Sequence, residues 1–306
     1  MERDSAQAFQ VNNEFARLER VIIGHGSPYQ RDKDKVAAEM AEFPLVPDTD
    51  RKEEVLALSY PTEQALIGEY HNYVDVLQRY GVEVLRADTD AAYSFDYTCP
   101  RDIGFVIGDR FFIANMAVSS RRDEIETIRQ TLDAADPDCI VQPPADCLLE
   151  GGDVILLDAQ TVLVGHHLRS NRRGFEFLEQ YLSPLGYRVH AVPHRQLHLD
   201  CCLNPLGRGH MLMHRDSLYD LDAETEALLG RFDWISVDAV EREYLATNVL
   251  SINPDTIIAR DHPACARVNE ALVARGYTVE AIEFDGVPAT GGSFRCASLA
   301  LNRSNS

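Results

Sequence analysis

The sequence repeats one pattern of secondary structure about five times along its 306 residues. Apolar, glycine-punctuated runs typical of β-hairpins alternate with amphipathic helical patterns, and a short apolar strand follows most of the helices. The hairpin-like runs cover 20–26, 104–116, 153–166, 208–214, 247–260 and 291–301. A period of roughly 50 residues is the signature of a repeat architecture, and helices of one class in every unit favour α/β units arranged around a centre.

The predicted helices carry their own boundary signals. Leu66, Tyr70, Tyr73 and Leu77 fall on one helical face, and Gly81 follows them as a C-terminal cap. The other predicted helices cover 125–132, 173–185, 222–231 and 265–275. The alternative is an ordinary α/β sheet with a phosphate-binding turn. The turn Gly24-His25-Gly26 lacks the third glycine of that fingerprint, so we expect a radial α/β fold in one domain, residues 1–306.

Composition excludes several kinds of partner. The chain carries 49 acidic and 29 basic residues, for a net charge of −20. Such a surface repels nucleic acid and anionic membranes, because both are bound through basic patches. The seven cysteines include no C-x-x-C pair, which favours a reducing cytoplasm over a secreted disulfide framework. No window approaches the apolar length of a membrane span, so we expect a cytoplasmic protein.

One segment departs from the repeat. Residues 27–58 are polar, contain proline and interrupt the first unit for longer than a connection usually does. A loop of this length inside a compact domain usually serves function. We therefore expect 27–58 to be an active-site loop or lid.

The most reactive candidate lies close to the end of the chain. Cys296 follows Gly291-Gly292 and precedes an alternating run that indicates a buried strand. A cysteine at such a junction is held by a rigid element and faces whatever lies in front of it. A buried structural thiol is the alternative interpretation of this residue taken alone.

Three further motifs place polar side chains next to predicted strands. His198 and Asp200 share one face if their segment is extended. Glu150 precedes Gly151-Gly152-Asp153 and an apolar run, and Asp102 follows Arg101 before another apolar run. Taken singly, each motif also fits a structural role, such as a hydrogen-bonded histidine, a capped turn or a surface ion pair. In a radial repeat, however, strand ends from distant units converge on one place.

Taken together, the motifs resemble those of the guanidino-group-modifying enzymes, which include arginine deiminases, dimethylarginine dimethylaminohydrolases and arginine amidinotransferases. The resemblance covers nearly the whole chain and implies the pentein fold, a five-fold pseudosymmetric α/β propeller of ββαβ units. The motifs occur in family order as Arg101-Asp102, Ser120-Arg121-Arg122, Glu150-Gly151-Gly152-Asp153, Arg169-Ser170-Asn171, His198-Leu199-Asp200, Thr247-Asn248-Val249-Leu250 and Gly291-Gly292-Ser293-Phe294-Arg295-Cys296.

The resemblance implies a catalytic role for three of these residues. Cys296 would attack the central guanidinium carbon as a thiolate and form a covalent amidino intermediate. His198 would protonate the departing amine, and Glu150 would orient His198 and stabilise its charge.

The resemblance also implies substrate-binding roles. Asp102 and Asp200 would hold the planar guanidinium through charge-assisted hydrogen bonds. Arg121 and Arg169 would pair with a substrate carboxylate. Asp96 would contact an α-amino group or a guanidino nitrogen.

The family leaves more than one reaction open. The presence of Asp200 favours an unsubstituted guanidino group, so we expect hydrolysis of arginine or an arginine-like small molecule. Transfer of the amidino group to an acceptor amine is the alternative. Dimethylarginine hydrolysis and a non-catalytic binding role are less favoured. We expect no metal and no cofactor, and the sequence leaves the oligomeric state open, a homo-oligomer included.

Overall fold

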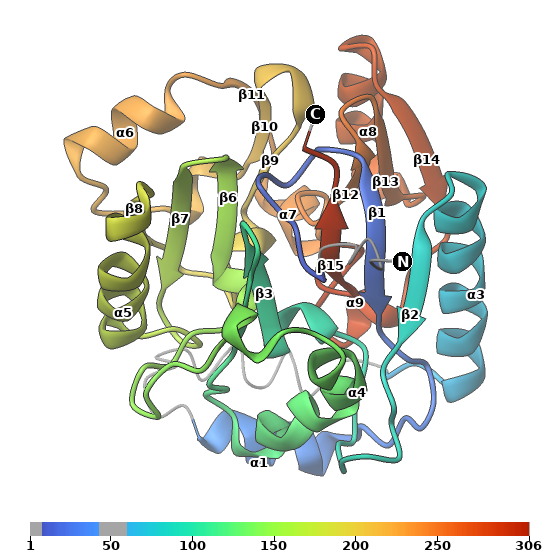
Figure 1. Ribbon diagram of the computed structural model, residues 1–306. Coiled ribbons are helices and arrows are strands. Elements are labelled where there is room, and N and C mark those ends of the chain that lie inside the picture. The colour runs from blue at the N-terminus through green and yellow to red at the C-terminus, as the bar shows by residue number, and fades with distance from the viewer. Residues whose placement is uncertain (1–7, 43–59, 306) are drawn as a thin grey trace, which may run out of the picture.

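A computed structural model describes residues 8–42 and 60–305, and these residues form five three-stranded sheets around a centre (Figure 1). In every sheet the first two strands run antiparallel and the second and third run parallel. A parallel pair needs a crossover connection, and helical segments supply it in each unit. The predicted propeller of ββαβ units is confirmed.

Four of the sheets use consecutive strands. They are β3 (Gly104–Ile107), β4 (Arg110–Ile113) and β5 (Ile140–Val141); β6 (Val154–Asp158), β7 (Thr161–His166) and β8 (Arg188–Pro193); β9 (Leu203–Pro205), β10 (His210–Met213) and β11 (Asp233–Ser236); and β12 (Leu250–Asn253), β13 (Thr256–Arg260) and β14 (Thr278–Ile282).

The fifth sheet joins the two ends of the chain. Its strands are β15 (Ser298–Arg303), β1 (Leu18–Ile23) and β2 (Glu83–Arg86). Strand β15 pairs antiparallel with β1, with Val21 opposite Ala300. The first and last hairpin-like runs of the sequence are therefore the two antiparallel strands of one sheet. This pairing closes the ring and places the turn before β15 at its centre.

Helices of four repeat units lie on the outside of the ring (Figure 1). They are α3 (Glu63–Arg79), α5 (Arg172–Leu182), α6 (Ala223–Leu229) and α8 (Ala266–Ala274). The predicted apolar face of α3 is confirmed, since Leu66, Tyr70, Tyr73 and Leu77 are all buried. Gly81 follows α3 with a φ of 77°, a left-handed conformation that glycine adopts without strain.

The predicted helix at 125–132 differs from the structure. Residues Ser119–Ile128 form a 3₁₀ helix, and only α4 (Arg129–Asp133) is α-helical. The hydroxyl of Thr127 donates to the carbonyl of Glu124 at 2.6 Å. A side chain that satisfies a backbone carbonyl in this way competes with the α-helical bond pattern.

The predicted loop at 27–58 is partly helical. Helix α1 (Lys33–Ala41) begins after Asp32, whose carboxylate accepts a hydrogen bond from the backbone N–H of Lys35 at 2.9 Å. Residues 43–59 lie outside the described part of the chain, so movement of this segment as a lid stays a prediction.

The aromatic core packs against the turn that carries Cys296. Phe294 stacks on Phe284 with ring centroids 4.3 Å apart and contacts Tyr73 edge-on at 5.2 Å. All three rings are buried. Because aromatic burial is one of the largest contributions to packing, these contacts fix the backbone two residues before Cys296.

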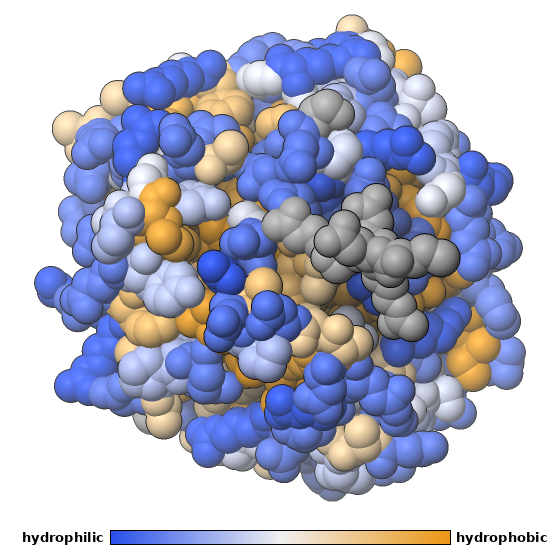
Figure 2. Space-filling model, in the orientation of Figure 1, coloured by the Kyte–Doolittle hydropathy of each residue, from blue (hydrophilic) through white to orange (hydrophobic). Residues whose placement is uncertain are grey.

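The face of the molecule shown in Figure 2 is mostly hydrophilic, with hydrophobic residues in small scattered groups. This distribution agrees with the acidic composition. Within the described residues, every helix is too short or too polar to cross a lipid bilayer.

Candidate active site

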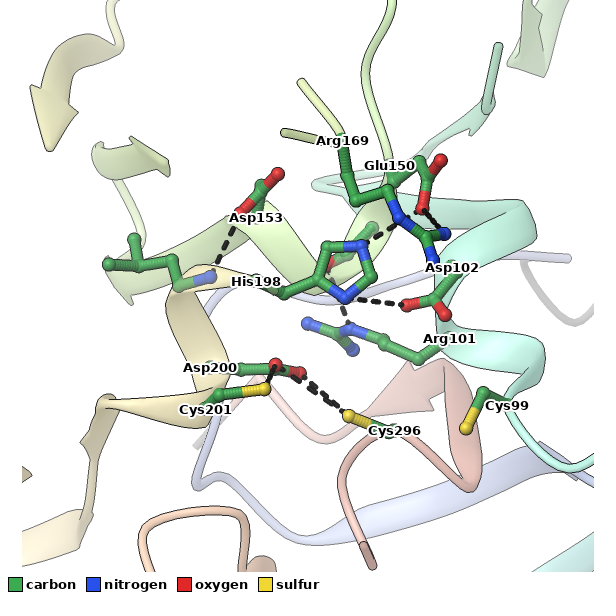
Figure 3. A network of polar contacts seen from close by, with 12 residues as sticks. Cys99, Arg101, Asp102, Glu150, Asp153, Arg169, His198, Asp200, Cys201 and Cys296 are labelled. Atoms are coloured by element: carbon green, nitrogen blue, oxygen red, sulfur yellow. Dashed lines mark hydrogen bonds and ion pairs between the residues drawn. The ribbon is translucent and has the colours of Figure 1, made fainter. Parts of the chain in front are cut away.

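The segments that precede the first strands of the five sheets meet at the centre of the ring. Figure 3 shows side chains from these segments facing one another. Asp102 precedes β3, Glu150 precedes β6, His198 and Asp200 precede β9, Asn248 precedes β12, and Cys296 precedes β15. Of the sequence-predicted residues, a pocket is lined by Asp96, Asp102, Arg121, Arg169, His198 and Cys296. Glu150 and Asp200 do not line this pocket, but Glu150 contacts His198 and Asp200 contacts Cys296.

His198 lies between two carboxylates. Its Nε2 is 2.9 Å from Oε2 of Glu150, and its Nδ1 is 3.6 Å from Oδ1 of Asp102. Burial alone would lower the pKa of His198, but the charge of Asp102 and the hydrogen bond with Glu150 raise it to about 10. The imidazole is therefore protonated at neutral pH and can donate a proton.

Glu150 stays ionised although it is fully buried. Burial would raise its pKa, but Arg169 and His198 lower it below the ordinary value. Oε2 also accepts a hydrogen bond from Nη1 of Arg169 at 3.2 Å, and Oε1 accepts one from the backbone N–H of Ala117 at 2.9 Å. These contacts hold the carboxylate in the position that orients His198.

Asp102 has one carboxylate oxygen that lacks a hydrogen bond among the described residues. Its Oδ2 accepts a hydrogen bond from Nη1 of Arg121 at 2.7 Å, whereas Oδ1 has no hydrogen-bond partner among the described residues. Burial would raise the pKa of Asp102, but His198 and Arg121 lower it. An ionised carboxylate with an unused acceptor is suited to bind a cationic N–H group.

Arg121 is already extensively bonded. Its Nε and Nη2 donate to Glu124 at 3.1 and 2.9 Å, and its Nη2 also donates to the carbonyl of Cys99 at 2.9 Å. Burial raises the pKa of Glu124 to about 7 even though Arg121 opposes this shift. The guanidinium of Arg121 lies at the pocket wall, with each of its three nitrogens donating to the protein.

Cys296 is held by Asn248 on two sides. Oδ1 of Asn248 accepts from the backbone N–H of Cys296, and Nδ2 donates to its Sγ, both at 3.1 Å. The same Sγ lies 3.5 Å from Oδ2 of Asp200. A hydrogen bond with Cys201, burial and the Asp200 carboxylate raise the pKa of the Cys296 thiol well above its usual range. The thiol is therefore protonated in the free protein.

Asp200 reaches the site from a turn, and the predicted extended segment is wrong. Residues Leu199–Cys201 form a 3₁₀ turn. The backbone N–H of Leu199 donates to Oδ1 of Asp153 at 2.8 Å, and the same oxygen lies 3.0 Å from Nε2 of His194. Oδ2 of Asp200 accepts from Nη1 of Arg295 at 2.6 Å. The buried ion pair turns Asp200 toward the thiol of Cys296.

Asp96 has partners on both oxygens. Oδ1 accepts from the backbone N–H and the hydroxyl of Thr98 at 2.9 and 2.6 Å. Oδ2 accepts from Nη1 of Arg31 at 2.8 Å. Asp96 thus joins the pocket wall to the segment that begins at residue 27.

Sequence reasoning missed several residues of the site. Glu14 lies behind the pocket and pairs with both Arg101 and Arg295 at 3.0 Å. Arg101 is buried, so the alternative interpretation of Arg101-Asp102 as a surface ion pair is wrong. No local pattern marks Glu14, since its partners are far along the chain. For Cys201, the only signal in the sequence is its position next to Asp200.

Among the described residues, two groups of side chains have donor atoms close enough to share a metal ion. They are Asp102, Glu150 and His198, and Asp200, Cys201 and Cys296, with the donor atoms of each group within 4.8 Å of one another. Arg121 is bound to Asp102 and Arg295 to Asp200. Metals bind neutral imidazole and thiolate, so the protonated His198 and the protonated thiol of Cys296 would each have to lose a proton before their group held a metal.

The site combines a nucleophile, Cys296, with an acid, His198. It also contains a carboxylate oxygen of Asp102 that has no hydrogen bond among the described residues. The thiol of Cys296 can form a covalent bond to a planar electrophile, and protonated His198 can supply a proton to a leaving group. The carboxylates of Asp102 and Asp200 favour a cationic electrophile. A cation in front of Cys296 would also lower the pKa of its thiol.

Comparison with known proteins gives a consistent result. The chain matches the family described as N,N dimethylarginine dimethylhydrolase, eukaryotic, over residues 49–303. It is similar to the uncharacterized protein YkgA of Bacillus subtilis (strain 168), with 32% identity over 235 residues, which are 77% of this chain and 79% of the relative.

Solved structures of several other proteins have a similar fold, and two of them serve as examples. One is SxtG, an amidinotransferase from Microseira wollei, with a TM-score of 0.75 and 20% identity over 98% of each chain. Another is the N-terminal domain of ArgZ, an arginine dihydrolase from cyanobacteria, with a TM-score of 0.73 and 17% identity. That match covers 93% of this chain and 98% of the other. At these identities the likeness concerns the fold alone.

Proposed function

The chain belongs to the N,N dimethylarginine dimethylhydrolase family of guanidino-group-modifying enzymes, and on this premise we propose that it hydrolyses the guanidino group of arginine or an arginine-like small molecule. The observation that carries the proposal is the placement of Cys296, between Asn248 and Asp200, in the pocket that also contains protonated His198. The reaction proceeds through a covalent amidino intermediate on Cys296, with no part played by nucleic acid or a membrane.

The first half-reaction uses the charges already present. The guanidinium binds with its N–H groups toward Oδ1 of Asp102 and toward Asp200, and its positive charge lowers the pKa of the Cys296 thiol. The thiol loses its proton to water, and the thiolate forms a bond to the central carbon. His198 gives its proton to the departing amine as the carbon–nitrogen bond breaks.

The second half-reaction returns the enzyme to its starting state. His198 is now neutral, so it can accept a proton from a water molecule that attacks the amidino carbon. The bond to Cys296 breaks as the carbonyl group of the product forms, and the thiolate takes up the proton that the product's hydroxyl gives up. Glu150 keeps the imidazole oriented in both steps because the ion pair with Arg169 fixes its carboxylate.

The contacts of Asp200 favour an unsubstituted guanidino group. Its carboxylate lies 3.5 Å from Sγ of Cys296, where an N-methyl group would meet an ionic acceptor without a proton to offer it. The family match supports dimethylarginine as a second candidate substrate. Arg121 and Arg169 place positive charge at the pocket wall, which favours a substrate with a carboxylate.

Transfer of the amidino group to an amine is the second candidate reaction. It shares the first half-reaction, and only the acceptor in the second half differs. The likeness to the fold of an amidinotransferase leaves this reaction open.

One experiment separates these candidates. The protein is incubated with arginine or dimethylarginine, with and without glycine, lysine or ornithine, and the products are identified by mass spectrometry. We expect citrulline and ammonia from arginine without any acceptor. A new guanidino compound formed only with an acceptor would support the transferase instead.

The role of the thiol needs its own variants. Cys296→Ala and Cys296→Ser should abolish turnover while the circular dichroism spectrum and the melting temperature stay close to those of the unsubstituted protein. Cys265→Ala, at a buried thiol that does not line the pocket, is the control. Undiminished turnover by either Cys296 variant would rule out the proposed mechanism.

A further inference from the structure

A cluster of buried charges lies behind the pocket. It consists of Glu14, Arg101 and Arg295, which are 6%, 5% and 2% exposed. The described residues that line the pocket do not include these three, so they do not touch a ligand bound there. Replacing a buried charge cluster by apolar packing is often neutral for stability, so a cluster at this place points to a role in the site.

Arg295 holds the carboxylate that faces the nucleophile. Its Nη1 donates to Oδ2 of Asp200 at 2.6 Å, and the same oxygen lies 3.5 Å from Sγ of Cys296 (Figure 3). The other contacts of this carboxylate among the described residues are to the thiols of Cys201 and Cys296, which are weak donors. The bond from Arg295 is charge-assisted on both sides, so it fixes the orientation of Asp200.

Glu14 holds Arg295 from the other side. Its Oε1 accepts a hydrogen bond from Nη2 of Arg295 at 3.0 Å, and the same Nη2 donates to the carbonyl of Val154 at 2.9 Å. The guanidinium of Arg295 is thus held between two carboxylates, with Asp200 on Nη1 and Glu14 on Nη2. Because Glu14 balances part of the charge of Arg295, Asp200 keeps the negative charge that attracts a second cation.

The same glutamate also joins the segment that carries Asp102 to the cluster. Nη2 of Arg101 donates to Oε1 of Glu14 at 3.0 Å, and Nε of Arg101 donates to the carbonyl of Gly151 at 3.2 Å. Burial and the nearby charge of Arg295 lower the pKa of Arg101. Glu14 therefore separates two like charges, each of which adjoins a residue of the site in the sequence.

We propose that Arg295 and Glu14 are positioning residues, with Arg295 orienting Asp200 toward the substrate guanidinium and Glu14 fixing Arg295. This inference rests on the proposed function, because Asp200 acts only if a guanidinium lies in front of Cys296. Both residues act through Asp200 and without contact to the substrate. Their effect is confined to the charged end of the ligand, so a ligand that is neutral at that end gains nothing from them.

The test measures binding without turnover, with two ligands that differ at one end. In a Cys296→Ser background, calorimetry into the millimolar range gives dissociation constants for arginine and for citrulline, whose ureido group is neutral. Arg295→Met should weaken arginine about 10- to 100-fold and leave citrulline nearly unchanged. Glu14→Gln should weaken arginine less, and it should add nothing in a protein that already carries Arg295→Met.

Two further variants separate positioning from packing. Arg260→Met is the matched control, since Arg260 is also buried and pairs with Asp285 at 2.6 Å without lining the pocket. It should change neither dissociation constant. Arg295→Lys keeps the charge but loses the fork that bridges two carboxylates, so it serves if Arg295→Met does not fold. It should weaken arginine by a smaller factor and again spare citrulline.

The two ligands also give the results that would overturn the positioning role. They are equal weakening of arginine and citrulline by the Arg295 variants, unchanged binding of arginine, and failure of the Cys296→Ser protein to bind arginine. If the expected pattern holds but the unsubstituted protein turns over neither arginine nor dimethylarginine, the proposed reaction fails and the positioning of Asp200 stands.

Discussion

The imidazole of His198 and the carboxylate of Glu150 form a buried pair, with 2.9 Å between Nε2 and Oε2. The two residues belong to neighbouring units of the ring and precede strands β9 and β6. Burial lowers the pKa of His198, but the charge of Asp102 and the hydrogen bond with Glu150 raise it to about 10. Glu150 of one repeat unit therefore helps to set the charge state of His198, the proposed acid, in the next unit.

Replacing Glu150 with glutamine tests this coupling. Glutamine keeps the shape and a hydrogen bond but removes the charge, so the pKa of His198 should fall. We expect kcat to drop about 10²- to 10⁴-fold at neutral pH, and the alkaline limit of activity to move to lower pH. The pH profile of kcat and the titration of the His198 ring by NMR measure both effects.

The matched control is Glu126→Gln, at a partly exposed carboxylate that pairs with Arg129 on the surface. It should leave kcat and its pH profile nearly unchanged. An unshifted alkaline limit in Glu150→Gln would show that Glu150 does not set the charge of His198.

The Cys296 thiol should react more slowly in the free protein than an exposed thiol. Its pKa is raised by the hydrogen bond with Cys201, by burial and by Asp200. Alkylation by iodoacetamide, followed by peptide mass spectrometry, should speed up with rising pH beyond the usual range for a thiol. Cys201→Ala removes the first of these causes and should move the rate profile to lower pH.

Cys265→Ala serves as the control for that shift, because Cys265 is buried outside the pocket. An identical profile for Cys201→Ala and the unsubstituted protein would mean that Cys201 has no effect on the nucleophile.

Asn248 should matter for stability and turnover together. Its Oδ1 accepts from the backbone N–H groups of Ser293 and Cys296 at 3.2 and 3.1 Å. Asn248→Ala leaves both buried donors unpaired, at a cost of about 2–4 kcal/mol in the free energy of unfolding. Turnover should fall because the turn that carries the thiol loses its anchor. Urea unfolding and steady-state kinetics measure the two effects.

A second buried asparagine gives the comparison. Asn204 donates to the carbonyls of Thr247 and Val249 and does not contact Cys296. Asn204→Ala should destabilise the protein with a smaller loss of kcat. Equal kinetic effects in the two variants would reduce the role of Asn248 to packing.

Much of the ring could be predicted from the sequence because its signals are local. Hydrophobic period and glycine caps depend on residues a few positions apart, and the run from Leu66 to Leu77 followed by Gly81 shows both. The candidate site also followed from one topological fact, that segments before the first strands converge. That fact and the family order of the motifs were enough to predict His198, Glu150 and Cys296 as residues of the candidate site.

Other parts of the site depend on distant pairings. Glu14 acquires its importance from Arg101 and Arg295, which the closure of the ring brings beside it. The 3₁₀ conformation at Ser119–Ile128, in which the Thr127 hydroxyl donates to the Glu124 carbonyl, is not marked by the hydrophobic period of the sequence.

Glu14 provides a test of these long-range contacts through the pH dependence of stability. Burial would raise its pKa, but Arg101 and Arg295 lower it to about 2, from an ordinary value of 4.5. A group with a lowered pKa contributes stability above its unfolded value and loses it as pH falls toward the folded value. Glu14 should therefore contribute about 3 kcal/mol at neutral pH that disappears between about pH 4.5 and pH 2.

The variant Glu14→Gln isolates this contribution. We expect it to lower the free energy of unfolding by about 3–5 kcal/mol at neutral pH, since Arg101 and Arg295 then remain buried without their shared carboxylate. Its stability should also decline less steeply with acid than that of the unsubstituted protein. Glu19→Gln, at an exposed carboxylate on β1, should change neither quantity. Urea unfolding at a series of pH values measures both, and parallel acid profiles for Glu14→Gln and the unsubstituted protein would contradict the assignment.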